Sequence, residues 1–175
     1  GTYFEKLKTL VTKAEVVRKS VPANPSNTRF QRSVADSVNY CRERFLNSEC
    51  DYMLIVESDV IPPVDLLSKF SDDIDVLDKK ITIGPERPWG ILGALYYPGF
   101  HDYTVEGLSQ THHVLSGCTV YRRSLLQRYP FRYSNENLGA FPDAWICVDS
   151  GWEYTLWNDH SIHCKHLNRI DGSRH

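Results

Sequence analysis

The stretch Tyr52–Val56 constrains the fold more than any other part of the sequence, because all of its residues are apolar. A strand with one face in water alternates apolar and polar residues, whereas a strand covered on both faces is apolar throughout. The stretch therefore predicts a central strand of a parallel sheet. Pro62 and Pro63 break the chain soon afterwards, and proline is tolerated in the first turn of a helix. We expect a helix there, and its buried side would be formed by Val64, Leu66, Leu67 and Phe70.

Helical and extended patterns alternate along the rest of the chain. Helical spacing of apolar residues predicts helices at 3–10 and 28–47, and shorter helices are expected at 122–129 and from 142 to Gly151. Strands are expected at 15–21, 81–83, 91–97 and 114–121, and a final strand or loop at 153–166. The polar residues 98–110 are expected to be irregular. The pattern predicts an α/β fold with a mostly parallel central sheet flanked by helices.

Length, charge and cysteine usage narrow the class of protein. A chain of 175 residues favours one domain spanning 1–175, alone or within a longer protein. The net charge of -2 provides no broad positive field for nucleic acid, and we expect no nucleic-acid partner. No apolar run approaches the roughly twenty residues of a membrane helix. The 5 cysteines form no CxxC pair, which favours reduced thiols and a cytoplasmic location.

An acidic triplet, Glu57-Ser58-Asp59, directly follows the apolar strand. Open α/β sheets bind ligands just beyond the carboxyl ends of their strands, and hard divalent cations prefer carboxylate oxygens. The triplet therefore favours a site for Mn²⁺ or Mg²⁺. The alternative is that Glu57 and Asp59 cap the next helix or face solvent, and the triplet by itself leaves both interpretations open.

The residues around the triplet resemble a known family. Residues 51–67 look like the metal-binding segment of family 2-like glycosyltransferases of the GT-A fold, in which an apolar strand leads to a DxD motif and then a helix. Arg29 resembles a basic position near the nucleotide, and Ser116-Gly117 resembles the small residues of the donor side. Asp143, within Phe-Pro-Asp-Ala-Trp, resembles the acidic catalytic residue on the acceptor side, and His166 resembles a late histidine that joins the metal.

The resemblance implies a GT-A, nucleotide-diphospho-sugar transferase-like fold and a glycosyltransferase of the hexosyl or N-acetylhexosaminyl type. Its partners would be a nucleotide-sugar donor and a carbohydrate or other hydroxyl acceptor. If the reaction inverts the anomeric centre, Asp143 would be the catalytic base, with Asp149 as the second choice. The implied metal ligands are Glu57, Asp59 and His166, and the implied substrate-binding residues are Arg29, Ser58, Ser116, Gly117, Trp145 and Trp152.

The chain departs from the family pattern in two respects. Glu57 stands where the family more often has the first aspartate, so Asp59 is the firmer metal ligand. The family fold normally begins with a strand that helps to hold the nucleotide base, whereas this chain begins almost directly with the helix expected at 3–10. We therefore expect the fold to lack its first strand, and the base pocket is either incomplete or formed upstream.

Other interpretations compete with this one. A nucleotidyltransferase also uses a metal and a similar sheet, but its glycine-rich phosphate loop is absent from the sequence. A non-catalytic module that binds sugars or nucleotides would fit the short chain. Trp145 and Trp152 are either sugar-stacking or core residues. The group His160, His163, Cys164 and His166 contains zinc-ligand types, although its spacing matches no common structural zinc site.

Overall fold

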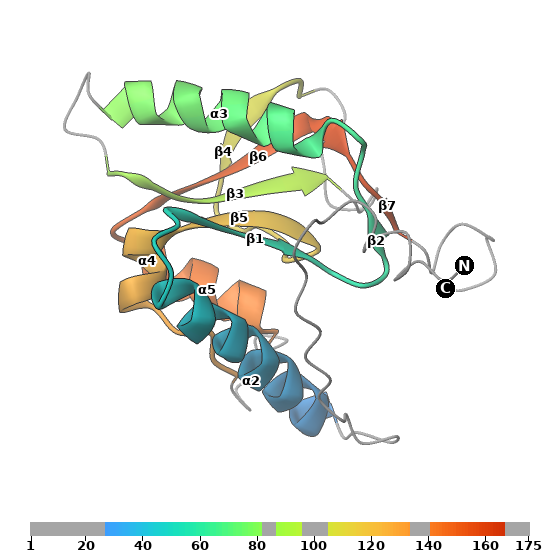
Figure 1. Cartoon of the computed structure of the whole chain (residues 1–175), viewed down its shortest axis with the longest axis vertical. Coiled ribbons are helices and arrows are strands. Elements are labelled where there is room, and N and C mark those ends of the chain that lie inside the picture. Colours follow the sequence, from blue (N-terminus) through green and yellow to red (C-terminus); the bar gives the residue numbers. More distant parts are fainter. Residues whose placement is uncertain (1–26, 82–86, 96–104, 134–140, 167–175) are drawn as a thin grey trace.

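Helices cover both faces of a five-stranded sheet (Figure 1). The structure, a computed structural model, describes residues 27–81, 87–95, 105–133 and 141–166, with the side chains of 27–30 and 81 excepted. The sheet has the order β1-β5-β3-β6-β4, formed by β1 (Tyr52–Val56), β5 (Cys118–Arg122), β3 (Trp89–Leu95), β6 (Thr155–His163) and β4 (Leu108–Thr111). A small second sheet pairs β2 (Val60–Ile61) with β7 (Lys165–His166).

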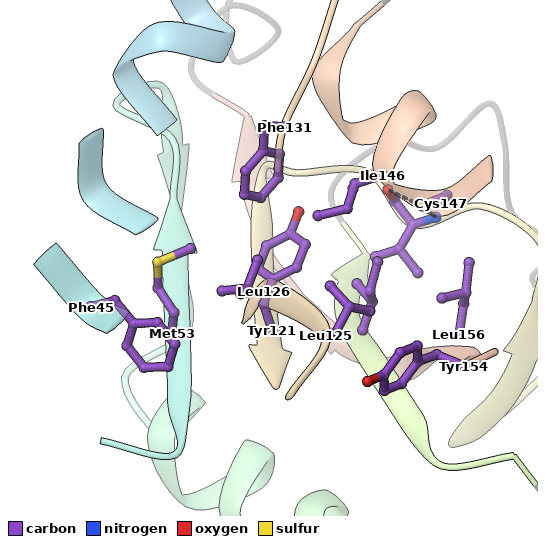
Figure 2. Packing of buried hydrophobic residues seen from close by; sticks show 12 residues of the cluster. Phe45, Met53, Tyr121, Leu125, Leu126, Phe131, Ile146, Cys147, Tyr154 and Leu156 are labelled. Carbon is purple, nitrogen blue, oxygen red and sulfur yellow. Dashed lines mark hydrogen bonds between the residues drawn. The ribbon is translucent and has the colours of Figure 1, made fainter. Parts of the chain in front are cut away.

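The helices lie in two layers, one on each side of the sheet (Figure 1). One face is covered by α2 (Asn27–Leu46), α4 (Arg123–Arg128) and α5 (Pro142–Ser150), and the other by α3 (Leu66–Ile81). Each layer has its own hydrophobic core. Figure 2 shows the core beneath α2, α4 and α5, in which Phe45 and Met53 lie at one end and Leu156 at the other. Leu66, Phe70 and Leu77 anchor α3 to the opposite face.

Strand β3 shows why the central sequence is continuously apolar. Ile91 joins the core beneath α4 and α5, whereas Leu92 joins the core beneath α3. Successive side chains of a strand point to opposite faces, so both sets must be apolar when both faces are covered. All seven residues of β3 are buried. Gly93 is required by close packing here, because a Cβ at this position would lie 2.4 Å from Val114.

The mixed sheet corrects the prediction of a mostly parallel one. Only β3 and β6 pair in parallel among the described strands, while β1–β5, β5–β3 and β4–β6 are antiparallel. The connection through α3 does return β3 in the direction of β1, as the alternating pattern predicts. However, β5 lies between them. Strand β1 is therefore an edge strand of the described sheet, with an antiparallel neighbour, rather than a central parallel strand.

Most of the predicted elements that fall within the described residues are confirmed. These are α2, β1, a helix after Pro63, β3, β5, α4, α5 and β6. The strand predicted at 81–83 is wrong at Ile81, which ends α3, and the strand predicted from 114 begins only at Cys118. Residues 108–110 form part of β4 and are not irregular, since β6 supplies a partner for them. The elements predicted at 3–10 and 15–21 lie outside the described residues.

The helix after Pro63 buries a narrower face than expected. Leu66 and Phe70 are buried as predicted, whereas Val64 and Leu67 are exposed. Val64 precedes the first residue of α3, and Leu67 lies one position from Leu66, which is too close in sequence to share its face of a helix. The apolar residues therefore predicted the helix correctly. They did not predict which of its side chains are buried.

Candidate functional site

The candidate site begins where β1 ends beside the start of β5. The two strands are antiparallel, so the residue after β1 meets the residues before β5. The backbone N–H of Glu57 donates to the carbonyl of Gly117 at 2.9 Å. Ser116 and Gly117 form a turn before β5 rather than an interruption within it. This pairing brings Glu57 and Ser116 together although 59 positions separate them in the sequence.

Ser116 connects the two carboxylates of the site. Its hydroxyl donates to Glu57 Oε1 at 2.6 Å, and its backbone N–H donates to Asp143 Oδ2 at 3.2 Å. Asp143 lies in the first turn of α5, directly after Pro142, where the helix dipole favours a negative charge. Its other oxygen accepts from the N–H of Ala144 at 2.9 Å. The Asp143 carboxylate is buried and held by two backbone donors, which fix its orientation.

The small second sheet brings His166 to Asp59. In the β2–β7 ladder Val60 is directly opposite His166, so the residue before Val60 lies beside the histidine ring. The distance between Asp59 Oδ2 and His166 Nε2 is 3.3 Å. Both side chains are partly exposed. Strand β7 thus returns the chain to the end of β1, where His166 contacts Asp59.

The electrostatics of the site are dominated by its carboxylates. Burial raises the pKa of Glu57 above its ordinary value, and the neighbouring charges of Asp59 and Asp143 raise it further. The hydrogen bond from Ser116 and the proximity of His166 oppose this change. The pKa of Glu57 therefore depends on Asp59, Ser116, Asp143 and His166. A cation bound here would relieve the repulsion among the carboxylates.

The Asp59–His166 pair is suited to a divalent cation. Neighbouring ligands in an octahedral shell of about 2.1 Å radius lie about 3 Å apart, close to the separation of these two atoms. Among the described residues, no three His, Cys, Asp or Glu side chains converge as a ready metal cluster. Mg²⁺ commonly takes only one or two carboxylates and completes its shell with water and substrate phosphates. The residues present fit such an open site, with Glu57 beside it.

Three further residues predicted to bind substrate lie in different parts of the fold. Ser58 is exposed between Glu57 and Asp59, and Gly117 is buried. Arg29 falls within α2, but its side chain lies outside the described residues.

The two tryptophans proposed for stacking occupy different environments. Trp145 is buried, and the guanidinium of Arg132 lies 3.7 Å from the centre of its ring. Trp152 is 85% exposed just after α5. The same Arg132 forms a two-pronged salt bridge with Asp149, at 2.6 and 2.8 Å. Asp149, the second choice for the base, is thus engaged away from Glu57 and Ser116.

The side chains of His160 and His163 in β6 do not lie together. His160 is hydrogen bonded to Ser109 at 2.6 Å, whereas His163 is exposed. Alternate residues of β6 point to opposite faces, which separates these rings from one another. Within the described ranges no zinc-type cluster is formed. His166 belongs instead with Asp59.

A pocket of about 390 Å³ beside α5 contains residues that sequence reasoning did not nominate. It lies between the end of α5 and the strands β4 and β6. Its polar lining includes Arg87, Gln110 and Thr111. The sequence signal for them was weak, because β4 was expected to be irregular and its side chains could not be assigned to a face. Trp152, at the same pocket, was predicted from its residue type.

The chain matches no protein-family model and no curated protein. Among solved structures it resembles A197 from STIV, with a TM-score of 0.50 and 15% sequence identity. The similarity covers 76% of this chain and 66% of A197, so the chain spans just under two thirds of that protein's length. At this identity the resemblance concerns the fold alone. It supports a mixed α/β architecture with helices on both faces of the sheet.

The described helices are short or carry charged residues. The longest of them, α2, has 20 residues and includes several arginines. None of the helices in the described ranges combines the length and apolar character that crossing a bilayer requires.

Proposed function

We propose that this chain is a metal-dependent glycosyltransferase with a GT-A-like fold, which moves a sugar from a nucleotide-diphosphate donor to an acceptor hydroxyl. The observation that carries the proposal is the convergence of Glu57, Ser116 and Asp143 beside the Asp59–His166 pair. These residues come from distant parts of the sequence. They include the acidic, small and histidine positions that the family resemblance singles out in the same order.

Asp59 and His166 are the residues that would hold Mn²⁺ or Mg²⁺, with Glu57 next to them. When bound, the cation supplies positive charge against the diphosphate as it leaves the sugar. The ligand positions left open by the protein suit the two phosphates and water. The cation that Asp59 and His166 would hold is therefore what would favour a diphosphate over an uncharged ligand.

Asp143 is the proposed general base of an inverting reaction. The acceptor oxygen forms a bond to the anomeric carbon while the bond from that carbon to the phosphate oxygen breaks. The electron pair leaves with the diphosphate, and the hydroxyl proton passes to Asp143. Ser116 and Ala144 orient the carboxylate through their N–H groups, so that it is positioned before the acceptor arrives.

Calorimetric titration with UDP, GDP and dTDP, in Mn²⁺ or in EDTA, tests the metal-dependent part of the proposal. We expect one of these diphosphates to bind only with the metal, and Asp59→Ala to weaken that binding at least about tenfold. Asp65→Ala is the matched control, because Asp65 is an exposed carboxylate paired with Lys69 outside the site. Unchanged binding by Asp59→Ala, or equal binding in EDTA, would contradict the proposal.

A transfer assay then separates an enzyme from a binding module. The wild-type chain is incubated with UDP-, GDP- and dTDP-sugars and a panel of saccharide acceptors, and release of the diphosphate is followed. We expect turnover that depends on the acceptor. Metal-dependent binding without hydrolysis or transfer across the panel would support a non-catalytic nucleotide-sugar module instead.

A further inference from the structure

Two neighbouring pockets lie along the flank of α5. The pocket of about 390 Å³ near the end of the helix and a second pocket of about 270 Å³ near its start share His112, Cys147 and Val148. The second pocket reaches Ala144, the residue after Asp143. We call the two together the α5 groove. With a helical rise of about 1.5 Å per residue, the residues of α5 that line it, from Ala144 to Val148, span about 6 Å, and Trp152 lies beyond the end of the helix.

The lining of the α5 groove combines an exposed aromatic ring with neutral hydrogen-bonding groups. Trp152 is 85% exposed, although an indole gains considerable free energy from burial. Gln110 presents an exposed amide from β4, whereas the hydroxyl of Thr111 is hydrogen bonded to the backbone of His113. Tyr154 and Leu156 add buried apolar surface to the lining. A pyranose ring has one apolar face of C–H groups and a rim of hydroxyls. This lining offers a partner to each of them.

The charge of the groove argues against other small ligands. Arg87 is the one arginine or lysine among the described residues that line the groove, and none of those described residues carries a carboxylate. Arg87 also donates to the carbonyl of Gly151, which engages part of its hydrogen-bonding capacity. A diphosphate would need more positive charge than this, and a cationic ligand would have no carboxylate to pair with. A neutral, hydroxyl-rich ligand fits the lining best.

From the groove's position and chemistry we infer that it binds a saccharide acceptor, which contacts Trp152 and has its reacting end toward Ala144 and the neighbouring Asp143. This inference rests on the proposed function for the role of the reacting end, but not for saccharide binding itself. Trp152 then contacts the acceptor away from the bond that forms.

Saccharide binding is tested without nucleotide or metal. The wild-type chain and its variants are screened on an array of neutral oligosaccharides, and the best saccharide is titrated in EDTA while tryptophan fluorescence is followed. We expect binding to perturb the emission of an exposed indole, and Trp152→Ala to weaken binding about tenfold, the scale of one lost aromatic contact. Trp152→Phe should restore most of the affinity, because it retains a ring.

Two controls distinguish this inference from the proposed function. Leu67→Ala removes another exposed apolar side chain, on α3, and should bind the saccharide like the wild type. Asp59→Ala should also retain saccharide binding, while Trp152→Ala should retain metal-dependent diphosphate binding. The inference is overturned if the array shows no saccharide bound, or if Trp152→Ala binds as the wild type does. Loss of diphosphate binding alone would instead count against the glycosyltransferase proposal.

Discussion

At the scale of single residues, the candidate site depends on Ser116, which contacts two carboxylates through different atoms. A hydroxyl and an N–H of one residue have a fixed separation, so Glu57 and Asp143 are held in a defined relation to each other. Their mutual repulsion contributes to the raised pKa of Glu57. The family resemblance selected Ser116 from its place in the chain. It did not indicate that Ser116 would hydrogen bond to both Glu57 and Asp143.

Asp143→Asn tests the role of the base at this scale. The asparagine carbonyl can still accept from the N–H of Ser116, whereas the N–H of Ala144 loses its acceptor. We therefore expect the fold and diphosphate affinity to be preserved, with a small loss of stability. An amide cannot take the acceptor proton, and kcat should fall by about 10²–10⁴-fold. Steady-state transfer and a thermal melt measure the two effects. Asp149→Asn is the control, because Asp149 pairs with Arg132, and it should retain kcat. The reverse pattern would assign the base to Asp149.

At the scale of the elements, Arg123 joins the end of α2 to the start of α4. Its guanidinium donates to the carbonyls of Phe45 and Leu46, the last residues of α2, and to those of Ser48 and Cys50 beyond it. The final carbonyls of a helix have no partner within the helix, and a cation also suits the negative end of its dipole. Arg123 therefore terminates α2 and fixes the turn that leads into β1.

Arg123→Lys keeps the charge but replaces a planar group with five donors by a point charge. We expect it to lower the free energy of unfolding by about 2 kcal/mol, since several carbonyls lose their charged donor. Urea unfolding monitored by circular dichroism measures this. Arg128→Lys is the matched control, because Arg128 is in the same helix but pairs with Glu153 near the surface. Its effect should stay within about 0.5 kcal/mol. Equal effects of the two substitutions would contradict the capping role.

The helices and strands could largely be predicted from local patterns, but which strands pair with each other could not. The apolar run of β1 and the spacing within α2 correctly predicted a strand and a helix. Nothing local to β1 specifies that β5, over 60 residues later, pairs with it in place of β3. Arg123 illustrates the same limit, since the pair Arg122-Arg123 resembles a solvated helix start. Strand order and side-chain capping depend on long-range contacts, which one sequence does not contain.

At the scale of the whole molecule, a carboxyl pair lies between the α3 layer and the sheet. Burial and the adjacent Asp159 raise the pKa of Asp73 to about 7, with Asp72 adding to this and Lys69 opposing it. Asp159 is buried in β6, and its two oxygens already accept from the N–H and hydroxyl of Ser161. Protonated Asp73 can donate to Asp159, whereas two ionised carboxylates repel each other. The contact between the two carboxyl groups is thus favourable only while Asp73 holds its proton.

This pair gives the stability of the fold a defined pH dependence. Asp73 binds its proton more tightly in the folded state, with a pKa of about 7, than in the unfolded state, where an aspartate has a pKa of about 3.9. The folded chain therefore holds more protons between these values, and the free energy of unfolding falls as pH rises from about 4 to about 7. Part of this effect is screened, because Asp73 is only partly buried.

Thermal melts from pH 5 to pH 8 compare the wild type with Asp73→Asn. The asparagine amide can donate to Asp159 at every pH, so the variant should lose most of the wild type's decline in Tm over this range. At pH 8 it should be more stable by about 1 kcal/mol, the scale of one recovered hydrogen bond. Asp75→Asn serves as the control, since Asp75 is an exposed carboxylate on the same helix, and it should follow the wild-type curve. A decline that persists in Asp73→Asn would place the titrating group elsewhere and remove the pair as its cause.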